Sequence, residues 1–253
     1  MALFALADTH LSISTDKPMD IFGRRWENWD KKLISAWLET VTDEDTVVIP
    51  GDISWGISLE EAKEDLLLLN SLPGKKLIGY GNHDYWWSTA SKINAFFEEY
   101  GITTVELFYN NAFAVGETVI CGTRGWYTDE KTAQSAKIKA DYDKIVNRET
   151  VRLQLSIAEA NKLIAASPTP LTPIAFFHFP PVFEHYVCRP ILDILHANGI
   201  KQCYFGHIHG QYNTPPETVF EGITFSIISA DYLNFRPKEI KIVNEELISH
   251  KNS

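Results

Sequence analysis

Several short apolar runs in this chain end in a polar stretch rich in aspartate and histidine, and this pattern constrains the fold more than any other feature. Short apolar runs bounded by turn residues are typical of buried β-strands. In α/β folds, functional side chains gather just past the carboxyl ends of such strands. The polar stretches are Asp8-Thr9-His10, Gly51-Asp52, Gly81-Asn82-His83-Asp84, His178 and Gly206-His207-Ile208-His209-Gly210.

Strand and helix patterns alternate along most of the chain, which predicts an α/β fold. Strands are expected at residues 3–7, 46–49, 76–80, 103–107, 112–115, 118–121, 174–177, 202–205, 222–229 and 239–243, and helices at residues 29–40, 59–70, 88–99 and 189–198. Residues 130–165 contain neither glycine nor proline, which predicts two long helices in succession. The sequence shows no internal repeat and no linker, so we expect one domain over residues 1–253.

The composition is that of a packed globular protein, and the charge argues against some functions. Hydrophobic residues make up 45% of the 253 residues, and the formal net charge is −10 at pH 7. A protein that coats nucleic acid needs a basic surface, so we expect no general nucleic-acid binding. No apolar stretch approaches the ~20 residues that a transmembrane helix requires, so we expect no membrane association.

The cysteines indicate a reducing compartment. Cys121, Cys188 and Cys203 are odd in number, and no two of them have the CxxC spacing. The first residues are apolar, but they lack the basic region and cleavage site of a signal peptide and are typical of a first strand. We therefore expect a cytoplasmic protein, and the sequence assigns no oligomeric state.

The polar stretches contain side chains that bind transition metals. Alternate residues of an extended segment face the same side, so Asp8 and His10 can reach one ion. The same holds for His207 and His209. Some motifs alone have a commoner explanation, because an aspartate at a strand end is usually a turn residue and a lone histidine such as His178 is usually a core residue. Gly206-His207-Ile208-His209-Gly210 is the strongest single signal. Together, five of the eight histidines follow apolar runs, and carboxylate with imidazole suits Mn, Fe or Zn.

The complete array, Asp-x-His, Gly-Asp, Gly-Asn-His-Asp, His and Gly-His-x-His in this order, resembles the calcineurin-like metallophosphoesterase superfamily over residues 8–209. The resemblance implies a four-layer α/β sandwich, in which two mixed β-sheets pack face to face with helices outside. It also implies two divalent or trivalent transition-metal ions. By resemblance, the first ion is bound by Asp8, His10 and His209, the second by Asn82, His178 and His207, and both by Asp52.

The resemblance further implies hydrolysis of a phosphate ester, in which a hydroxide shared by the two ions attacks phosphorus. In the family, the histidine of the Gly-Asn-His motif, here His83, protonates the leaving oxygen or stabilises charge at the phosphoryl group. An imidazole pKa near neutrality suits this task. Asp84 is the second candidate catalytic residue and would orient this loop or His83, or else cap the next helix. Asn82 and Arg124, which stands between two glycines, are candidates for holding the substrate phosphate.

Departures from the protein phosphatases of this superfamily narrow the expected substrate. Residues 51–56 lack the second Asp and the Arg of the motif Gly-Asp-x-x-Asp-Arg-Gly, and Gly-Asn-His-Asp replaces Gly-Asn-His-Glu. We expect a small bacterial-type phosphohydrolase that acts on a small phosphorylated substrate, either a mono- or a diester. Two alternatives remain: a nuclease, which the acidic charge disfavours, and a catalytically weak metal-binding scaffold for a partner protein, which the complete set of ligands disfavours.

Aromatic residues cluster around the motifs. Trp55 follows Asp52, residues 85–87 follow Asp84, and residues 126–127 follow Arg124. If they are exposed at the mouth of a site, such side chains can stack on a ring of the substrate. The commoner explanation is that they pack the layers of the fold together. For Arg24 and Arg25, a solvated loop is the expected environment.

Overall fold

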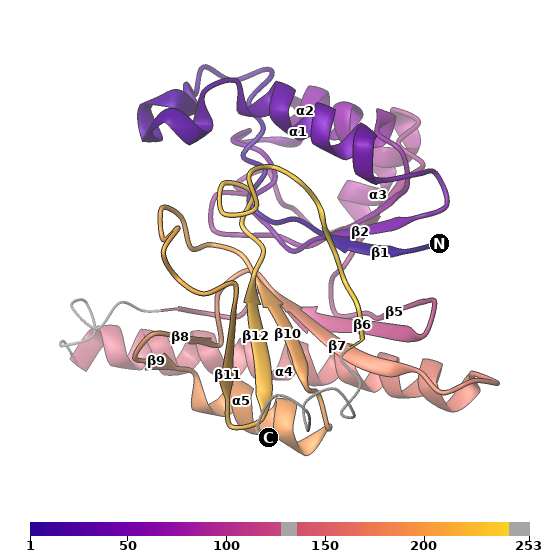
Figure 1. Ribbon diagram of the computed structural model, residues 1–253, viewed down its shortest axis with the longest axis vertical. Coiled ribbons are helices and arrows are strands. Elements are labelled where there is room, and N and C mark those ends of the chain that lie inside the picture. Colours follow the sequence, from indigo (N-terminus) through magenta and orange to yellow (C-terminus); the bar gives the residue numbers. More distant parts are fainter. Residues whose placement is uncertain (128–135, 243–253) are drawn as a thin grey trace, which may run out of the picture.

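Two β-sheets stack face to face, and helices cover the outer face of each sheet (Figure 1). The structure, a computed structural model, describes residues 1–127 and 136–242. Three hydrophobic clusters fill the three interfaces between the layers. The fold is therefore the four-layer α/β sandwich that the family resemblance implies.

The first sheet has the strand order β13-β1-β2-β3-β4. Every residue of its two central strands β1 and β2 is buried, because the sheet is covered on both faces, and this explains their nearly continuous apolar sequence. Each outer helix comes after one of the strands in the chain, and the helices pack on the outer face of this sheet (Figure 1). The elements of this half are β1 (Leu3–Ala5), α1 (Trp29–Thr40), β2 (Thr46–Ile49), α2 (Leu59–Ser71), β3 (Lys75–Ile78), α3 (Ala90–Glu99), β4 (Val105–Leu107) and β13 (Lys238–Glu239), with short 3-10 helices η1 (Met19–Phe22) and η2 (Arg24–Trp26).

The second sheet has the strand order β11-β12-β10-β7-β6-β5, with antiparallel edge strands β5 and β11 and parallel strands between them. Helices α4 and α5 cover its outer face (Figure 1). The elements are β5 (Phe113–Val115), β6 (Thr118–Thr123), α4 (Ala136–Ala166), β7 (Thr172–Phe177), the hairpin β8 (Val182–Phe183) and β9 (Tyr186–Val187), α5 (Arg189–Ala197), β10 (Gln202–Phe205), β11 (Glu217–Phe220) and β12 (Ile223–Ile227).

The structure corrects three details of the predicted elements. A single helix, Ala136–Ala166, replaces the two expected after residue 130, and residues 130–135 and 243 lie outside the described part of the chain. Helix α3 begins after Thr89 rather than Ser88, since the Thr89 hydroxyl accepts the Lys92 N–H. Strand β11, which the sequence does not predict, is an edge strand whose first three residues are exposed. No helix among the described residues is long and apolar enough to cross a membrane.

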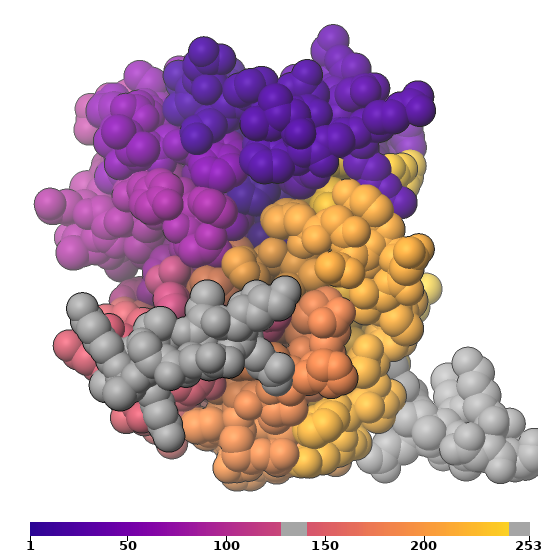
Figure 2. All heavy atoms as spheres, turned by 90° about the vertical axis from the view of Figure 1, so that its left-hand side faces the viewer, coloured from indigo at the N-terminus to yellow at the C-terminus, as the bar shows by residue number. Residues whose placement is uncertain are grey.

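The two sheets are joined just past the end of β1. The Ala7 N–H donates to the Ile228 carbonyl at 2.8 Å, and the Ala230 N–H donates to the Ala7 carbonyl at 2.9 Å. Strands β1, β2 and β3 are parallel to one another, as are β7 and β10. The bridge therefore brings the loops at the carboxyl ends of both sets of strands together. Figure 2 shows a face on which the indigo and magenta first half of the chain meets the orange second half.

Candidate metal centre

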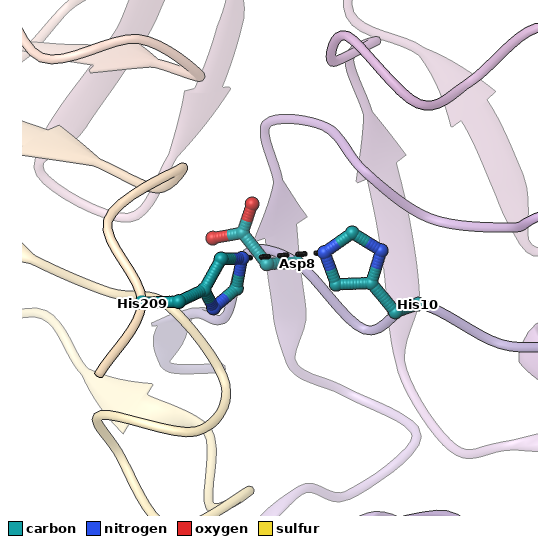
Figure 3. Close-up of side chains that lie close together, drawn as sticks. All are labelled: Asp8, His10 and His209. Carbon is teal, nitrogen blue, oxygen red and sulfur yellow. Dashed lines mark hydrogen bonds between the residues drawn. The ribbon is translucent and has the colours of Figure 1, made fainter. Parts of the chain in front are cut away.

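Asp8, His10 and His209 form one group of potential metal ligands (Figure 3). One ligand atom from each residue lies within 4.8 Å of the others. Asp8 and His10 follow β1 and His209 follows β10, so the two sheets contribute to the same group. The Nε2 atoms of His10 and His209 face each other at 3.3 Å. Two imidazoles placed in this way could each direct a ring nitrogen at one cation.

Asp52, His178 and His207 form a second group with the same spacing. The Asn82 Oδ1 atom lies 2.8 Å from His178 Nε2, which adds an amide oxygen to this group. Asp52, although a member of the second group, also lies close to a histidine of the first group. Its Oδ1 atom is 3.6 Å from His178 Nε2, and its Oδ2 atom is 3.7 Å from His10 Nε2. The two oxygens of a single carboxylate thus face a histidine of each group.

Four residues of these two groups have a left-handed backbone conformation. Asp8, His10, Asp52 and His207 have φ angles of 59°, 45°, 53° and 68°. Non-glycine residues are uncommon in this left-handed region, although aspartate and histidine tolerate it better than most. Such a conformation costs about 1–3 kcal/mol and persists only where the surrounding structure enforces it, which is typical of functional sites.

Two glycines allow the loops to approach the carboxylates closely. A Cβ atom at Gly81 would lie 2.0 Å from Asp52 Oδ1, and one at Gly206 would lie 2.5 Å from Asp8 Oδ2. Any side chain at either position would displace the carboxylate or the loop. The glycines that begin these two motifs are therefore explained by close contact with the other loops of the centre.

Burial controls the protonation of both groups. Burial raises the pKa of Asp8 to about 6, and burial together with neighbouring carboxylates raises the pKa of Asp52 well above its ordinary value. Burial and the surrounding histidines lower the pKa of His10 and of His178 far below neutrality, and lower the pKa of His207 to about 3. The imidazoles of His10, His178 and His207 are thus held neutral, as metal ligation requires. The pKa of His209 is instead raised, because the hydrogen bond to Asp231 and the charges of Asp231 and Asp8 outweigh burial. A cation would stabilise the ionised carboxylates and displace a proton from His209.

The residues present fit a bound metal. The ligand atoms of each group lie within 4.8 Å of one another, and burial lowers the pKa of the imidazoles of His10, His178 and His207, so that their ring nitrogens are available as ligands. A donor set of carboxylate, neutral imidazole and amide oxygen suits divalent transition metals such as Mn, Fe or Zn.

Asp84 ties two loops of the centre together. It is 5% exposed, and the described residues surround its carboxylate with N–H donors. Those donors are the backbone N–H groups of Asp52 at 2.7 Å, Ile53 at 2.8 Å, Ser54 at 3.2 Å and Gly81 at 2.8 Å, and the Trp86 Nε1 atom at 3.0 Å. Asp84 does not cap α3, whose N-cap is Thr89. This placement favours a positioning role over a direct catalytic one.

His83 lies beside the first group. Its ring centroid is 5.6 Å from that of His10, 4.4 Å from Trp55 and 6.3 Å from Tyr85. The Asp52 Oδ1 atom accepts the backbone N–H of His83 at 2.8 Å, which ties this loop to the centre. Burial lowers the pKa of His83, and nearby positive charge acts in the same direction. Negative charge placed beside the ring would act in the opposite direction and favour its protonated form.

Arg124 is a cation without an acidic partner among the described residues. Its guanidinium lies 5.1, 5.6 and 5.2 Å from the ring centroids of Tyr80, Trp126 and Phe179. Within the described part of the chain, the buried Nε atom of Arg124 has no hydrogen-bond acceptor. The positive charge of Arg124 opposes the effect of burial on the pKa of Asp52, so it acts on the centre.

Asp231 belongs to the centre but is not predicted from the sequence. It is fully buried, and its Oδ1 atom lies 2.8 Å from His209 Nδ1. Its Oδ2 atom accepts the Gly210 N–H at 3.1 Å and the Tyr212 hydroxyl at 3.0 Å. Metal-ligating histidines commonly donate their second ring N–H to such a carboxylate. An aspartate just past an apolar strand is the signal that could have identified it, as it did Asp8.

Arg25 has a different environment from the solvated loop expected for it. Its Nη1 atom donates to the Asp231 carbonyl at 2.8 Å, and its guanidinium lies 3.8 Å from the ring centroid of Tyr212. Arg25 therefore packs on the loop that supports His209 and neutralises part of the acidic charge there.

Known proteins resemble this chain in sequence and in fold. The family model described as calcineurin-like phosphoesterase matches residues 1–211. Protein TT1561 of Thermus thermophilus has a similar fold, with a TM-score of 0.51, 10% identity and coverage of 94% of this chain and 97% of that one. The protein of unknown function AQ665 from Aquifex aeolicus has a TM-score of 0.48 and 16% identity over 99% and 98% of the two chains. No curated protein matches the sequence.

Proposed function

Because the chain belongs to the calcineurin-like phosphoesterase family, a membership that implies metal-dependent hydrolysis of phosphate esters, we propose that it is a dinuclear phosphohydrolase acting on a small mono- or diester. The position of Asp52 carries this proposal. Its two oxygens lie 3.7 Å from His10 Nε2 and 3.6 Å from His178 Nε2. A shared carboxylate of this kind is what two adjacent ions require.

The ligand groups divide between the two ions. When bound, these ions would supply positive charge to the phosphoryl oxygens and lower the pKa of a water molecule toward neutrality. Neutral imidazoles and an amide oxygen add no negative charge, so the two carboxylates leave the site net positive toward a phosphate. In this proposal, Asp8, His10 and His209 hold the first ion, Asn82, His178 and His207 hold the second, and Asp52 contacts both.

His83 is the residue suited to protonate the leaving oxygen. Its buried Nδ1 atom has no hydrogen-bond partner among the described residues, and its ring belongs to neither ligand group. A phosphate placed beside the ring would raise the pKa that burial lowers, and the protonated ring would then give its proton to the departing oxygen. The leaving group would depart as a neutral alcohol.

Two further residues would bind the phosphate. The Nε atom of Arg124 has no hydrogen-bond partner among the described residues, and a guanidinium binds phosphate oxygens through two parallel N–H groups. Asn82 directs its amide oxygen at His178, so its amide nitrogen is the part that would contact a phosphate oxygen. Both residues come from loops that follow parallel strands, so they approach the centre from the same edge as the ligands.

The test is hydrolysis of p-nitrophenyl phosphate and bis-p-nitrophenyl phosphate by chelator-treated protein supplied in turn with Mn, Fe, Ni, Zn and Mg. We expect turnover with at least one transition metal, and the preferred ester distinguishes a monoesterase from a diesterase. Metal binding without turnover of either ester under any condition would contradict the proposed function and support the scaffold alternative.

A further inference from the structure

Tyr85 is an exposed aromatic residue beside the proposed proton donor. Its side chain is 63% exposed, and its ring centroid lies 6.3 Å from that of His83 with the two planes at 83°. The Tyr85 backbone N–H donates to the His83 carbonyl at 2.8 Å. A short turn therefore places Tyr85 next to His83 and leaves most of its ring open to solvent.

The two aromatic residues that follow Tyr85 have packing roles. Trp86 is 2% exposed and donates its Nε1 hydrogen to Asp84. The Trp87 ring stacks on Tyr80 with centroids 5.1 Å apart. For Tyr85, the one ring contact among the described residues is with His83. Packing explains the two tryptophans but leaves the exposed ring of Tyr85 unexplained.

Trp55, the other aromatic neighbour of His83, is already covered. It stacks on His10 at 5.0 Å with an interplanar angle of 23°, and the Lys17 ammonium lies 4.9 Å from its centroid. Its Nε1 hydrogen is donated to the Met19 sulfur at 3.1 Å. Trp55 packs against His83 and is partly buried by these contacts, so the more exposed aromatic ring beside His83 is that of Tyr85.

The leaving group must pass close to this surface. An oxygen that accepts a proton from His83 lies next to its ring, so the rest of the leaving group extends over the residues that flank His83. We propose that the leaving group of the substrate carries a planar ring, of the aryl or nucleobase type, that stacks on Tyr85; this inference rests on the phosphohydrolase function proposed above. A tyrosine face accepts any such ring without requiring a particular hydrogen-bond pattern.

The test uses competitive inhibition of the metal-loaded, full-length protein by 1-naphthylmethylphosphonate and by propylphosphonate. Phosphonates are not hydrolysed, so the reactivity of the leaving group has no influence on the comparison. Tyr85→Ala should weaken inhibition by the naphthyl compound about 5-fold or more, as loss of one stacking contact predicts, and change inhibition by the propyl compound less than about 2-fold. Tyr85→Phe is the matched control, because it keeps the ring and should therefore keep the preference for the naphthyl compound over the propyl compound.

Three results would overturn the stacking role if the wild-type protein still hydrolyses esters. Tyr85→Ala could change inhibition by both compounds equally, or change neither. The wild-type protein could also show no preference for the naphthyl compound. Absence of turnover in the wild-type protein on every ester and metal would overturn the phosphohydrolase function and this inference with it. The two failures are therefore distinguished by the activity of the unmodified protein.

Discussion

The carboxylate of Asp84 accepts the backbone N–H of Asp52 at 2.7 Å and thereby fixes the residue whose two oxygens face both ligand groups. The same carboxylate accepts the Gly81 N–H at 2.8 Å, so one side chain joins the loops after β2 and β3. Because these bonds are made to the main chain, Asp84 positions Asp52 without occupying the oxygens that a metal would use.

Asp84→Asn should weaken metal binding and destabilise the fold. Its amide NH₂ would face N–H donors, which leaves donors without acceptors at a cost of about 1–3 kcal/mol in the free energy of unfolding. Loss of an outer partner of this kind typically lowers metal affinity about 10–100-fold. Calorimetric titration of metal into chelator-treated protein and urea unfolding measure the two effects. The control is Asp193→Asn on the exposed surface of α5, and equal behaviour of the two variants would contradict the positioning role.

Asp231→Ala should selectively weaken the binding of one of the two ions. The 2.8 Å contact between Asp231 and His209 Nδ1 sets which ring nitrogen of His209 is free for the first group. Removing this partner should lower the affinity of one site about 10–100-fold and leave the other near its wild-type value. Asp231→Asn should lose less metal affinity, because its amide oxygen still accepts a hydrogen bond. A two-site titration that Asp231→Ala leaves unchanged is the result against this role.

His83→Gln should separate catalysis from metal binding. His83 belongs to neither ligand group, so metal content should be unchanged. Turnover should fall about 10²–10⁴-fold, the usual contribution of a general acid. Turnover and metal content are measured on one preparation. Full turnover with both ions bound would remove His83 from the proton-donating role.

Lys76 should make stability depend on pH above neutrality. Its buried ammonium donates to the carbonyls of Leu72 and Gly74, and burial lowers the pKa of Lys76 from 10.5 to about 8. Between pH 8 and pH 10.5 the unfolded chain binds more protons than the folded one, so the free energy of unfolding rises with pH. The wild-type protein should gain about 2 kcal/mol relative to Lys76→Met between pH 8 and pH 10. Denaturant unfolding of both proteins checks this, and parallel pH profiles would contradict it.

Much of the architecture follows from local patterns in the sequence. Apolar runs such as residues 46–49 must be strands buried on both faces, and polar residues just past them must meet at one edge when the strands are parallel. The convergence of Asp8 with His209 therefore needs only the strand order and the junction at Ala7.

Other features depend on contacts that form only in the folded chain. Asp231 acquires its role from a histidine 22 residues away in sequence, and no local pattern encodes that contact. The turn at Asp84 decides whether Tyr85 or Trp86 faces solvent. There the Asp84 carboxylate accepts the indole N–H of Trp86, which buries that ring. Helix α4 continues as one element because its buried residues, such as Val146 and Leu153, face one sheet throughout.

The most direct test of the central claim is elemental analysis of metal bound to reconstituted, desalted protein. The account predicts two ions per chain in the wild-type protein and about one in His209→Ala and in His178→Ala, since each of these changes removes a ligand from one group. Asp52→Ala should weaken both sites and retain less than either histidine variant. One ion or none in the wild-type protein, or two ions retained by Asp52→Ala, would contradict a shared dinuclear centre.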